Sequence, residues 1–468
     1  MSLTAASPRI PAFGPLRFYG DALKLVLPVM LQQLITAMIS LVDNFMVAGL
    51  GDEKMAAVNV ANQINFVWLV VVSTACMAGG IYLSQHRGAN NKEGMRQAFR
   101  FKLMLSLGFS TIHLVLCLVF PEVLIGFMLG GAGRNPGIVT EGARFLRLAS
   151  LGSLPFGISM AIGSSFRDIG RTKSPLVVSS VAAVLATVLN WLLIYGNLGF
   201  PRLEVQGAAV ATVVARVVEC LAFIGWAAYR RPDFAVRPRN ILAIDTSLFR
   251  SMLSKSAAMF ISETAWVVSE TIVTAIYNGR GGAETVAGMA AGWTIANLFF
   301  LVFPGIHTAT CVMVGSTLGA GELGEARKKG RWLLSGSAVF GAAAGLVAAS
   351  STAIVPLVFG NLSADARAVT VGLVFVIAMY LPLWAYINGQ FALSRAGGDT
   401  TMGIWVDVGV TYGVFIPTVL ALANLSTIGP VLLFGLAKIS DIPKALVAHW
   451  WLRKEKWVRN LAEREGSP

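Results

Sequence analysis

Charged side chains are scarce in this chain of 468 residues, because Asp, Glu, Lys and Arg together make up only 13% of it. A soluble domain carries roughly 25% charged residues. So few charges cannot cover a water-facing surface of this size. Hydrophobic residues make up 55%, and the mean hydropathy is +0.69. The composition therefore predicts an integral membrane protein whose surface faces the lipid bilayer.

Cysteine and the common catalytic motifs are also missing or rare. The four cysteines lie in apolar segments and form no CxxC pair, so their spacing predicts neither a disulfide framework nor a zinc site. The chain contains no Gly-x-x-x-x-Gly-Lys-Ser/Thr loop, no His-Glu-x-x-His, no Gly-x-Ser-x-Gly and no Asp-Asp-x-x-Asp motif. These absences argue against ATP hydrolysis and against an enzyme, and we expect no cofactor. A membrane enzyme acting on lipid is a further alternative.

The net charge of +13 raises nucleic acid as a partner, but the distribution of the charge argues against it. The basic residues cluster in short segments between apolar runs, as they do in cytoplasmic loops that face anionic headgroups. Counted along the chain, these basic segments come after every second apolar run. The positive-inside rule therefore places both termini in the cytoplasm. We expect a multi-pass protein, a monomer, in the inner membrane of a prokaryote, with no cleavable signal peptide.

Runs of about 20 apolar residues, the length that crosses a bilayer core, recur along the chain. We predict twelve such spans, at residues 25–49, 56–83, 102–121, 143–163, 175–197, 206–229, 252–277, 286–313, 332–358, 368–392, 402–423 and 428–450. The predicted parts are a cytoplasmic N-terminal segment, an N-lobe, a cytoplasmic linker, a C-lobe and a basic cytoplasmic tail, at residues 1–24, 25–230, 231–251, 252–450 and 451–468. The predicted fold is thus all-α, with two lobes of six transmembrane helices.

The two predicted lobes read as copies of one another. Residues 51–57 align with residues 282–288 at an offset of 231 positions, and residues 167–172 align with residues 395–400 at almost the same offset. Because each lobe has six spans, the lobes share one orientation and should be related by a pseudo-two-fold axis along the membrane normal. Two similar hydrophobic halves are the plan of a secondary transporter, with the substrate site between them near the midplane.

Several segments together resemble the multidrug and toxic compound extrusion (MATE) family. Pro28 and the run Leu41–Gly51 resemble the family's first helix, and Arg167-x-x-Gly170-x-Thr172-x-x-Pro175 and Gly207–Thr212 resemble later signatures. Arg395–Thr400 and Lys456–Leu461 fit the second half and the C-terminus. The resemblance covers essentially the whole chain in the expected order. It implies an antiporter that exports organic cations or amphiphilic drugs while Na⁺ or H⁺ enters. The alternative is a lipid-linked precursor flippase of the same wider superfamily.

Ionisable side chains inside spans are expensive and therefore functional candidates. Asp43 lies in the first span, with no lysine or arginine one helical turn away. The resemblance ties an acid at this place to cation coupling, in which the carboxylate is alternately protonated and free, or coordinates Na⁺. Asn190, in the fifth span, stands where some relatives carry an acid; it can ligate a cation but cannot release a proton. We predict Asp43 in both the coupling site and the substrate cavity, and Asn190 in the coupling site.

The second half carries three more candidate acids. Glu263 and Glu270 lie seven residues apart in the seventh span, and so on one helix face. Glu263 with Trp266 matches the acid of this helix in the resembled family. Asp407, in the eleventh span, completes the set. We predict Glu263 and Asp407 in cation coupling, and Glu263, Glu270 and Trp266 in the substrate cavity.

Two further acids each lie three positions from a base on one predicted helix. Arg216 with Glu219, and Lys438 with Asp441, are at a spacing that allows neutralisation on one helix face. We predict both as structural pairs. Pro28 interrupts the first span, and proline removes a helix hydrogen bond and favours a kink. We predict that Pro28 is a hinge whose bend responds to protonation of Asp43.

Overall fold

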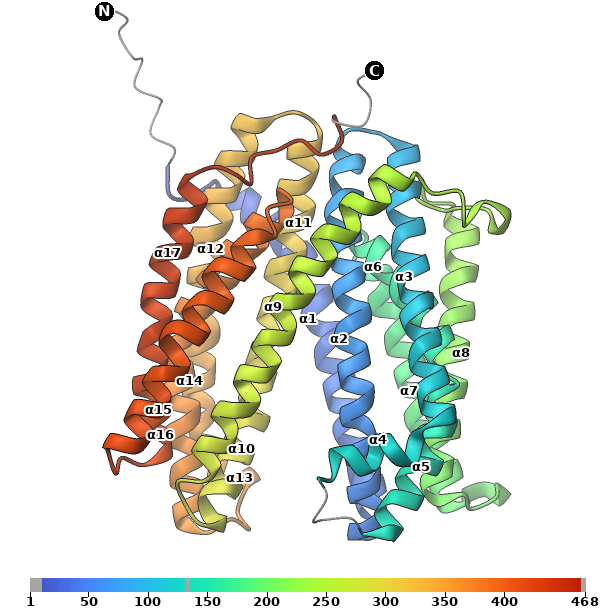
Figure 1. The fold of residues 1–468 in the computed structure, drawn as a ribbon, viewed down its shortest axis with the longest axis vertical. Coiled ribbons are helices and arrows are strands. Elements are labelled where there is room, and N and C mark those ends of the chain that lie inside the picture. Colours follow the sequence, from blue (N-terminus) through green and yellow to red (C-terminus); the bar gives the residue numbers. More distant parts are fainter. Residues whose placement is uncertain (1–10, 131–134, 464–468) are drawn as a thin grey trace, which may run out of the picture. The chain divides into compact units, whose positions relative to one another are not determined.

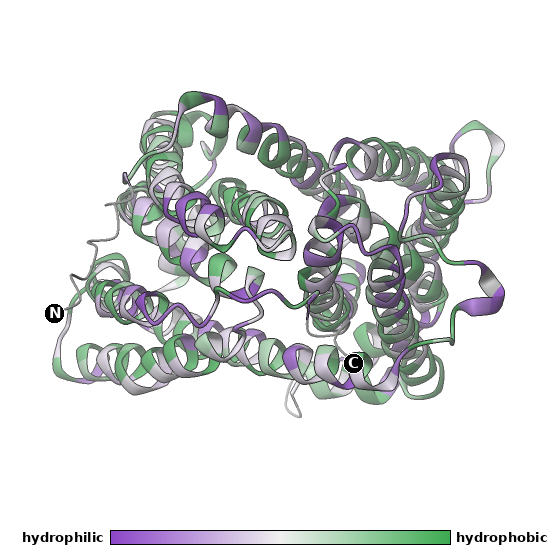
Figure 2. Ribbon diagram, turned by 90° about the horizontal axis from the view of Figure 1, so that it is seen from above, coloured by the Kyte–Doolittle hydropathy of each residue, from purple (hydrophilic) through white to green (hydrophobic). Residues whose placement is uncertain are grey.

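The computed structural model describes residues 11–130 and 135–463. The predicted terminal segments 1–24 and 451–468 lie partly outside these residues. Within the described ranges the secondary structure is helical throughout, without strands, as predicted. Hydrophobic residues dominate the helices, while hydrophilic residues gather at helix ends and in the connections (Figure 2).

The first half of the chain forms α1 (Leu16–Ala48), α2 (Asp52–Gly88), α3 (Lys92–Val119), α4 (Pro121–Met128), α5 (Pro136–Ser150), α6 (Ser153–Asp168), α7 (Lys173–Tyr195) and α8 (Glu204–Arg230). The second half forms α9 (Thr246–Asn278), α10 (Ala283–Phe300), α11 (Val302–Gly319), α12 (Leu323–Ser351), α13 (Val355–Val358), α14 (Ala364–Ala396), α15 (Ile416–Leu425), α16 (Pro430–Ala437) and α17 (Asp441–Arg453) (Figure 1). π-Helical turns, Gly403–Val408 and Thr411–Phe415, precede α15.

Among the described residues, ten helices are long and apolar enough to cross a membrane, and α5 with α6, bent by 50°, would make an eleventh span. This agrees approximately with the twelve predicted spans. The last predicted span, 428–450, consists of α16, a 3₁₀ turn over Lys438–Ser440 and α17, so that neither helix is long enough alone. The protein is therefore a multi-pass membrane protein.

Two compact units make up the chain. Unit 1 comprises residues 1–27, 88–90 and 261–468, and unit 2 comprises residues 28–87 and 91–260. α1 passes from unit 1 to unit 2 between Leu27 and Pro28, and α9 passes from unit 2 to unit 1 between Phe260 and Ile261. The predicted domain boundaries stay a prediction.

Side-chain contacts hold the first part of α1 in unit 1. The Tyr19 hydroxyl donates to the Trp332 carbonyl (3.1 Å), and the Phe18 ring packs edge-on against the Trp332 indole, with 5.2 Å between centroids. This packing accounts for the start of α1 at Leu16, nine residues before the predicted span.

The first part of α9 is held in unit 2 in a similar way. The Ser251 and Tyr82 hydroxyls lie 2.7 Å apart, and Phe249 packs edge-on against Phe101 at 5.4 Å. Each unit is therefore completed by the start of a helix that ends in the other unit.

Glycines allow close approach of α12 and α14 in unit 1. A Cβ atom added at Gly345 would lie 2.5 Å from the Ala378 carbonyl oxygen, and one added at Gly341 would lie 2.5 Å from the Ala385 Cβ atom. Small residues at such contacts let transmembrane helices pack tightly without a hydrophobic driving force. The buried residues Leu381 and Ala348 continue this contact into the core of the unit.

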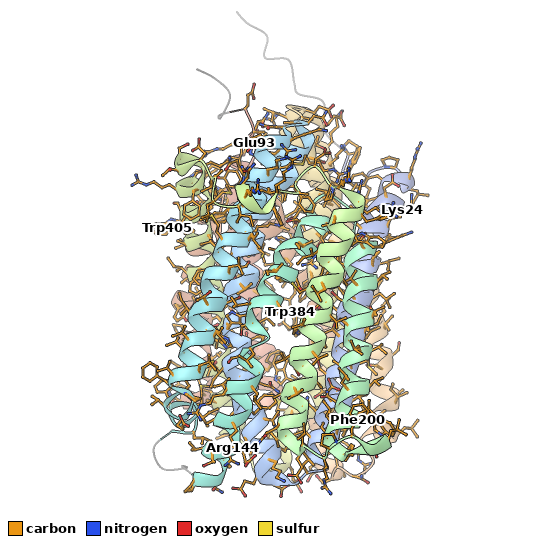
Figure 3. The ribbon with its side chains drawn as sticks, turned by 90° about the vertical axis from the view of Figure 1, so that its right-hand side faces the viewer. Lys24, Glu93, Arg144, Phe200, Trp384 and Trp405 are labelled. Atoms are coloured by element: carbon orange, nitrogen blue, oxygen red, sulfur yellow. The ribbon has the colours of Figure 1, made fainter. Side chains whose placement is uncertain are left out.

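One buried hydrophobic cluster of unit 2 lies at one end of the helices. Val47 of α1, Ile125 of α4, Leu146 of α5 and Ile194 of α7 belong to one buried cluster. Figure 3 shows that Arg144 and Phe200 lie at this end and Glu93 at the opposite end of the unit. The partly buried Asp43, four residues before Val47, therefore lies next to this cluster.

Candidate functional site

Asp43 of α1 meets α7 within unit 2. The Asp43 carboxylate accepts a hydrogen bond from the Thr187 hydroxyl (3.2 Å), and the Asn190 side chain lies beside the same carboxylate. Thr187 and Asn190 are three residues apart and thus on one face of α7. The structure therefore brings together Asp43 and Asn190, the two residues of the first half that the sequence singles out for cation coupling.

Two side chains at this site have oxygen atoms whose charge or hydrogen-bonding capacity the described residues do not match. In the described part of the chain, no lysine, arginine or histidine forms an ion pair with Asp43. Asn190 is 4% exposed, and its Oδ1 atom has no hydrogen-bond partner. A buried acceptor without a partner costs free energy, about 1–3 kcal/mol. Carboxylate, hydroxyl and amide oxygens are hard ligands, which suit a hard cation, and the carboxylate can alternatively take up a proton.

In unit 1, by contrast, the candidate acids are paired with bases. Glu263 of α9 accepts from Arg395 Nη2 of α14 at 2.9 Å, and Glu270 lies 3.4 Å from Lys438 Nζ. Asp407, in the π-helical turn Gly403–Val408, is paired with Lys444 of α17. All three predicted acids of the second half are thus neutralised by a base of another helix or turn.

Trp266, predicted in the substrate cavity beside Glu263, stands apart from these pairs. Its side chain is 49% exposed. Its carbonyl oxygen accepts from the Ser269 hydroxyl within the same helix. Its role in a cavity stays a prediction.

The two expected structural pairs have different outcomes. Arg216 Nη1 donates to Glu219 at 2.9 Å, as predicted, and the Ser179 hydroxyl also donates to Glu219 at 2.8 Å. The predicted pair of Lys438 with Asp441 is wrong. Lys438 pairs with Glu270, while Asp441 accepts from Trp384 Nε1 at 2.8 Å. The reason is that each residue meets a partner on another helix, Glu270 of α9 for Lys438 and Trp384 of α14 for Asp441, which spacing along one helix does not show.

Sequence reasoning missed three contributors. Thr187 precedes Asn190 by three positions, a helical spacing that could have revealed it. Lys444 lies 228 positions after Arg216, the offset that relates residues 167–172 to 395–400, so the repeat could have pointed to it. Arg395 lies beyond the predicted span 368–392, yet it belongs to the last turn of α14 and reaches Glu263.

Comparisons with known proteins agree with this architecture. The MatE family model matches residues 28–192 and 258–406, which is more than half of the chain. The chain is 25% identical over 322 residues to a probable multidrug resistance protein NorM of Thermotoga maritima, covering 67% of each chain. It is 28% identical over 328 residues to a protein of the same name from Deinococcus radiodurans, covering 70% of this chain and 69% of the relative.

Solved structures show the same fold. One is described as the outward-facing conformation of a multidrug resistance MATE family transporter; it has a TM-score of 0.82 at 19% identity and covers 97% of this chain and 98% of its own. Another, from Pyrococcus furiosus, is described as a transporter of the MOP superfamily with reverse polarity of its binding pocket. Its TM-score is 0.81 at 19% identity, covering 93% and 95%.

Proposed function

Because the chain belongs to the multidrug and toxic compound extrusion family, we propose that it is a secondary active antiporter. It exports organic cations or amphiphilic drugs in exchange for Na⁺ or H⁺ by alternating access. The relatives named as multidrug resistance proteins support this cargo class. The basic segments that follow the even-numbered spans support an orientation with both termini in the cytoplasm, and we propose that the protein is a monomer in the inner membrane.

The coupling ion binds at Asp43. The observation that carries this proposal is the carboxylate without an ion pair beside Asn190 Oδ1, a buried acceptor without a partner. Bound Na⁺ would satisfy both oxygens at once. A proton would neutralise the carboxylate and let it donate to a neighbouring acceptor. In either case the ion supplies the positive charge that the surrounding residues do not.

The second half has a supporting role in coupling. Glu263 and Asp407 are already neutralised by Arg395 and Lys444, so an incoming cation must first displace a base. The displaced base would lose its partner, which opposes cation binding at these acids. Asp43 requires no such displacement, and we therefore place the primary ion site in unit 2.

Pro28 is the hinge that converts ion binding into movement. Proline cannot supply a backbone hydrogen bond inside α1, and the passage of α1 from unit 1 to unit 2 falls at this residue. The equivalent passage in α9 contains no proline. A Pro28→Ala variant should therefore fold normally, by size-exclusion profile, but export poorly. Export at the wild-type rate would show that α1 does not bend there during the cycle.

The experiment that tests the function is dye efflux from cells that lack their own pumps. Cells expressing wild type should lose ethidium against a gradient, whereas Asp43→Asn cells should retain it like cells with an empty vector. A matched control is Asp21→Asn, which removes an exposed acid from the other part of α1. Repeating the assay with and without Na⁺ at fixed pH identifies the ion. Efflux that continues in Asp43→Asn cells would contradict this site, and retention by wild type would favour the flippase.

A further inference from the structure

The ammonium group of Lys438 sits among aromatic rings in unit 1. Its Nζ atom lies 4.3 Å from the ring centroid of Phe415 and 5.7 Å from the centroids of Trp384 and Phe434. Glu270 Oε1 lies 3.4 Å from the same nitrogen. We call Trp384, Phe415, Phe434 and Glu270 the ammonium box. Aromatic faces combined with one carboxylate are the arrangement by which proteins recognise ammonium ligands.

The walls of the box come from helical elements, whereas its occupant enters on a flexible side chain. The rings come from α14, a π-helical turn and α16, and Phe434 is fully buried. Figure 3 places Trp384 between the two ends of the helices, away from the end of unit 1 at which Lys24 and Trp405 lie. Lys438 enters from the 3₁₀ turn between α16 and α17 on a flexible four-carbon stem. The Lys438 and Glu270 side chains are 12% and 26% exposed, so the box is not sealed.

The charges around the box do not balance. Lys444 is under the electrostatic influence of Asp407, Asp441 and Glu270 together, so these acids are close neighbours. Lys438 and Lys444 supply two positive charges against three negative ones. By formal charge these five side chains have an excess of one negative charge, which a monovalent cation would balance.

A buried hydroxyl group near the box has no hydrogen-bond partner. The Tyr277 side chain is 1% exposed, and its hydroxyl has no hydrogen-bond partner. The Tyr277 ring packs edge-on against Phe434 at 5.6 Å, and its hydroxyl is under the electrostatic influence of Glu270 and Asp441. A buried hydroxyl without a partner is costly, and a ligand with a polar group beside its ammonium would satisfy it.

We propose that the ammonium box is a binding site for organic ammonium ions, and that Lys438 is a resident occupant which the ligand displaces. Asp441 can receive the displaced Lys438, because it directly follows the 3₁₀ turn Lys438–Ser440 and residues three apart on a 3₁₀ turn lie on the same side. Asp441 would then exchange its hydrogen bond from Trp384 Nε1 for an ion pair with Lys438. The box thus remains neutralised when empty of cargo and accepts cargo by partner exchange. This inference rests on the proposed export of organic cations for its cargo class.

The test measures equilibrium binding of benzyltrimethylammonium to purified full-length protein in Na⁺-free buffer. Replacing Lys438 by methionine keeps the length of the side chain but removes the competing charge. We expect Lys438→Met to bind the probe at least about tenfold more tightly than wild type, as loss of a competing cation–π and ionic contact implies. The double variant Lys438→Met/Glu270→Gln should lose this gain. Equal or weaker binding by Lys438→Met would overturn the proposal.

Matched controls separate the box from general electrostatics. Lys444→Met removes the same charge from the same cluster but from outside the box, so its gain should be clearly smaller; an equal gain would overturn the proposal. The neutral tert-butyl isostere of the probe should bind all variants alike. Phe415→Leu in the wild-type background should weaken binding, which keeps the test decisive if Lys438→Met does not fold.

The binding test and the transport test fail separately. The gain of Lys438→Met should persist when Asp43→Asn is added, because the ion site lies in unit 2. If the gain persists but no dye is exported, the box stands and the antiport function fails. If dye export depends on Asp43 but Lys438→Met shows no gain, the antiport function stands and the box fails.

Discussion

Two matching regions of the repeat place a polar contact between corresponding segments, but different residues make it. In unit 2, Arg216 of α8 and Ser179 of α7 both contact Glu219. At an offset of 228 positions, Lys444 takes the place of Arg216, and Asp407 takes the place of Ser179. The acid has moved from the base's own helix to the facing segment. The repeat thus preserves where a polar contact lies and leaves open which residue supplies the charge.

The two ion pairs differ in their exposure and in the elements that they join. Arg216 is 40% exposed and its pair forms within one helix, whereas Lys444 and Asp407 are 13% and 20% exposed and join two segments. The segment carrying Asp407 is π-helical, while α7 is a regular α-helix. π-Helical turns frequently mark functional sites. At this matched position unit 1 therefore joins two segments by an ion pair, whereas unit 2 joins them by the hydrogen bond from Ser179 to Glu219.

The largest effect should come from breaking the buried pair of unit 1. Asp407→Asn removes the ion-pair partner of Lys444 and leaves only Asp441 and Glu270 as more distant negative charges. We expect a loss of about 3 kcal/mol in the free energy of unfolding, at the lower end of the range for a broken buried pair. The double variant Asp407→Asn/Lys444→Met should recover most of that loss, because both charges are gone. Unfolding of purified protein in detergent measures both. A double variant as unstable as the single one would mean that the pair's attraction itself, not the orphaned charge, stabilises the contact.

A smaller but sharper effect is expected at the free carboxylate of unit 2. Asn190→Leu removes the amide beside Asp43 with little change in volume, and we expect coupling-ion affinity to fall about 10–100-fold. Thr187→Val, which removes only a hydroxyl, should cost less. Titration of the purified variants with Na⁺, and with protons in its absence, gives the affinities. Unchanged affinity in Asn190→Leu would remove Asn190 from the site.

The intrahelical pair of unit 2 should matter less than its counterpart in unit 1. Arg216→Met leaves Glu219 with its hydrogen bond from Ser179, and partly exposed ion pairs contribute up to about 1 kcal/mol. We expect a loss of that order by the same unfolding measurement. A loss as large as that of Asp407→Asn would show that moving the acid did not change the energetics.

The smallest effect on stability should come from the start of α9, one of the two helices that pass from one unit to the other. α9 begins after Asp245, whose carboxylate accepts from the Ser247 and Leu248 backbone N–H groups at 2.7 and 3.1 Å. These hydrogen bonds, and one from the Ser247 side chain, hold the pKa of Asp245 below its ordinary value. The folded-state pKa is therefore the lower one, so the contribution to stability is present above about pH 4 and is lost as the pH falls through the lowered pKa.

The measurement for this cap is a pH series of unfolding between pH 3 and pH 6. Asp245→Asn should show a slightly flatter profile than wild type at the acidic end. The first turn of α1 carries no acid, so that helix start has no corresponding titration. Identical profiles for variant and wild type would mean that the cap forms equally in the unfolded ensemble.

The sequence predicts most of the helices, because apolar runs of bilayer length leave the chain few alternatives. It also predicts Arg216–Glu219, since both residues lie on one regular helix. It fails at Lys438, whose partner Glu270 lies 168 positions away on another helix. Spacing along a chain reports only neighbours on the same element.

The candidate ion site is an intermediate case. Asp43 and Asn190 were each selected on grounds that did not involve the other, and only the packing of α1 on α7 shows that they meet. The unpartnered Asn190 Oδ1 atom is invisible to sequence reasoning, because it depends on what is absent around a buried side chain. The same holds for Tyr277 in unit 1.

The way α1 and α9 are shared between the units has a consequence for the order of biosynthesis. A ribosome delivers Tyr19 more than three hundred residues before Trp332, its partner in unit 1. Until α12 has been translated, the first residues of α1 lack their packing partner in unit 1. Unit 2 likewise waits for Ser251, after the whole first half has been translated. Neither half can mature by itself during translation, so fragments split between Arg231 and Thr246 should assemble only when both are made in the same cell.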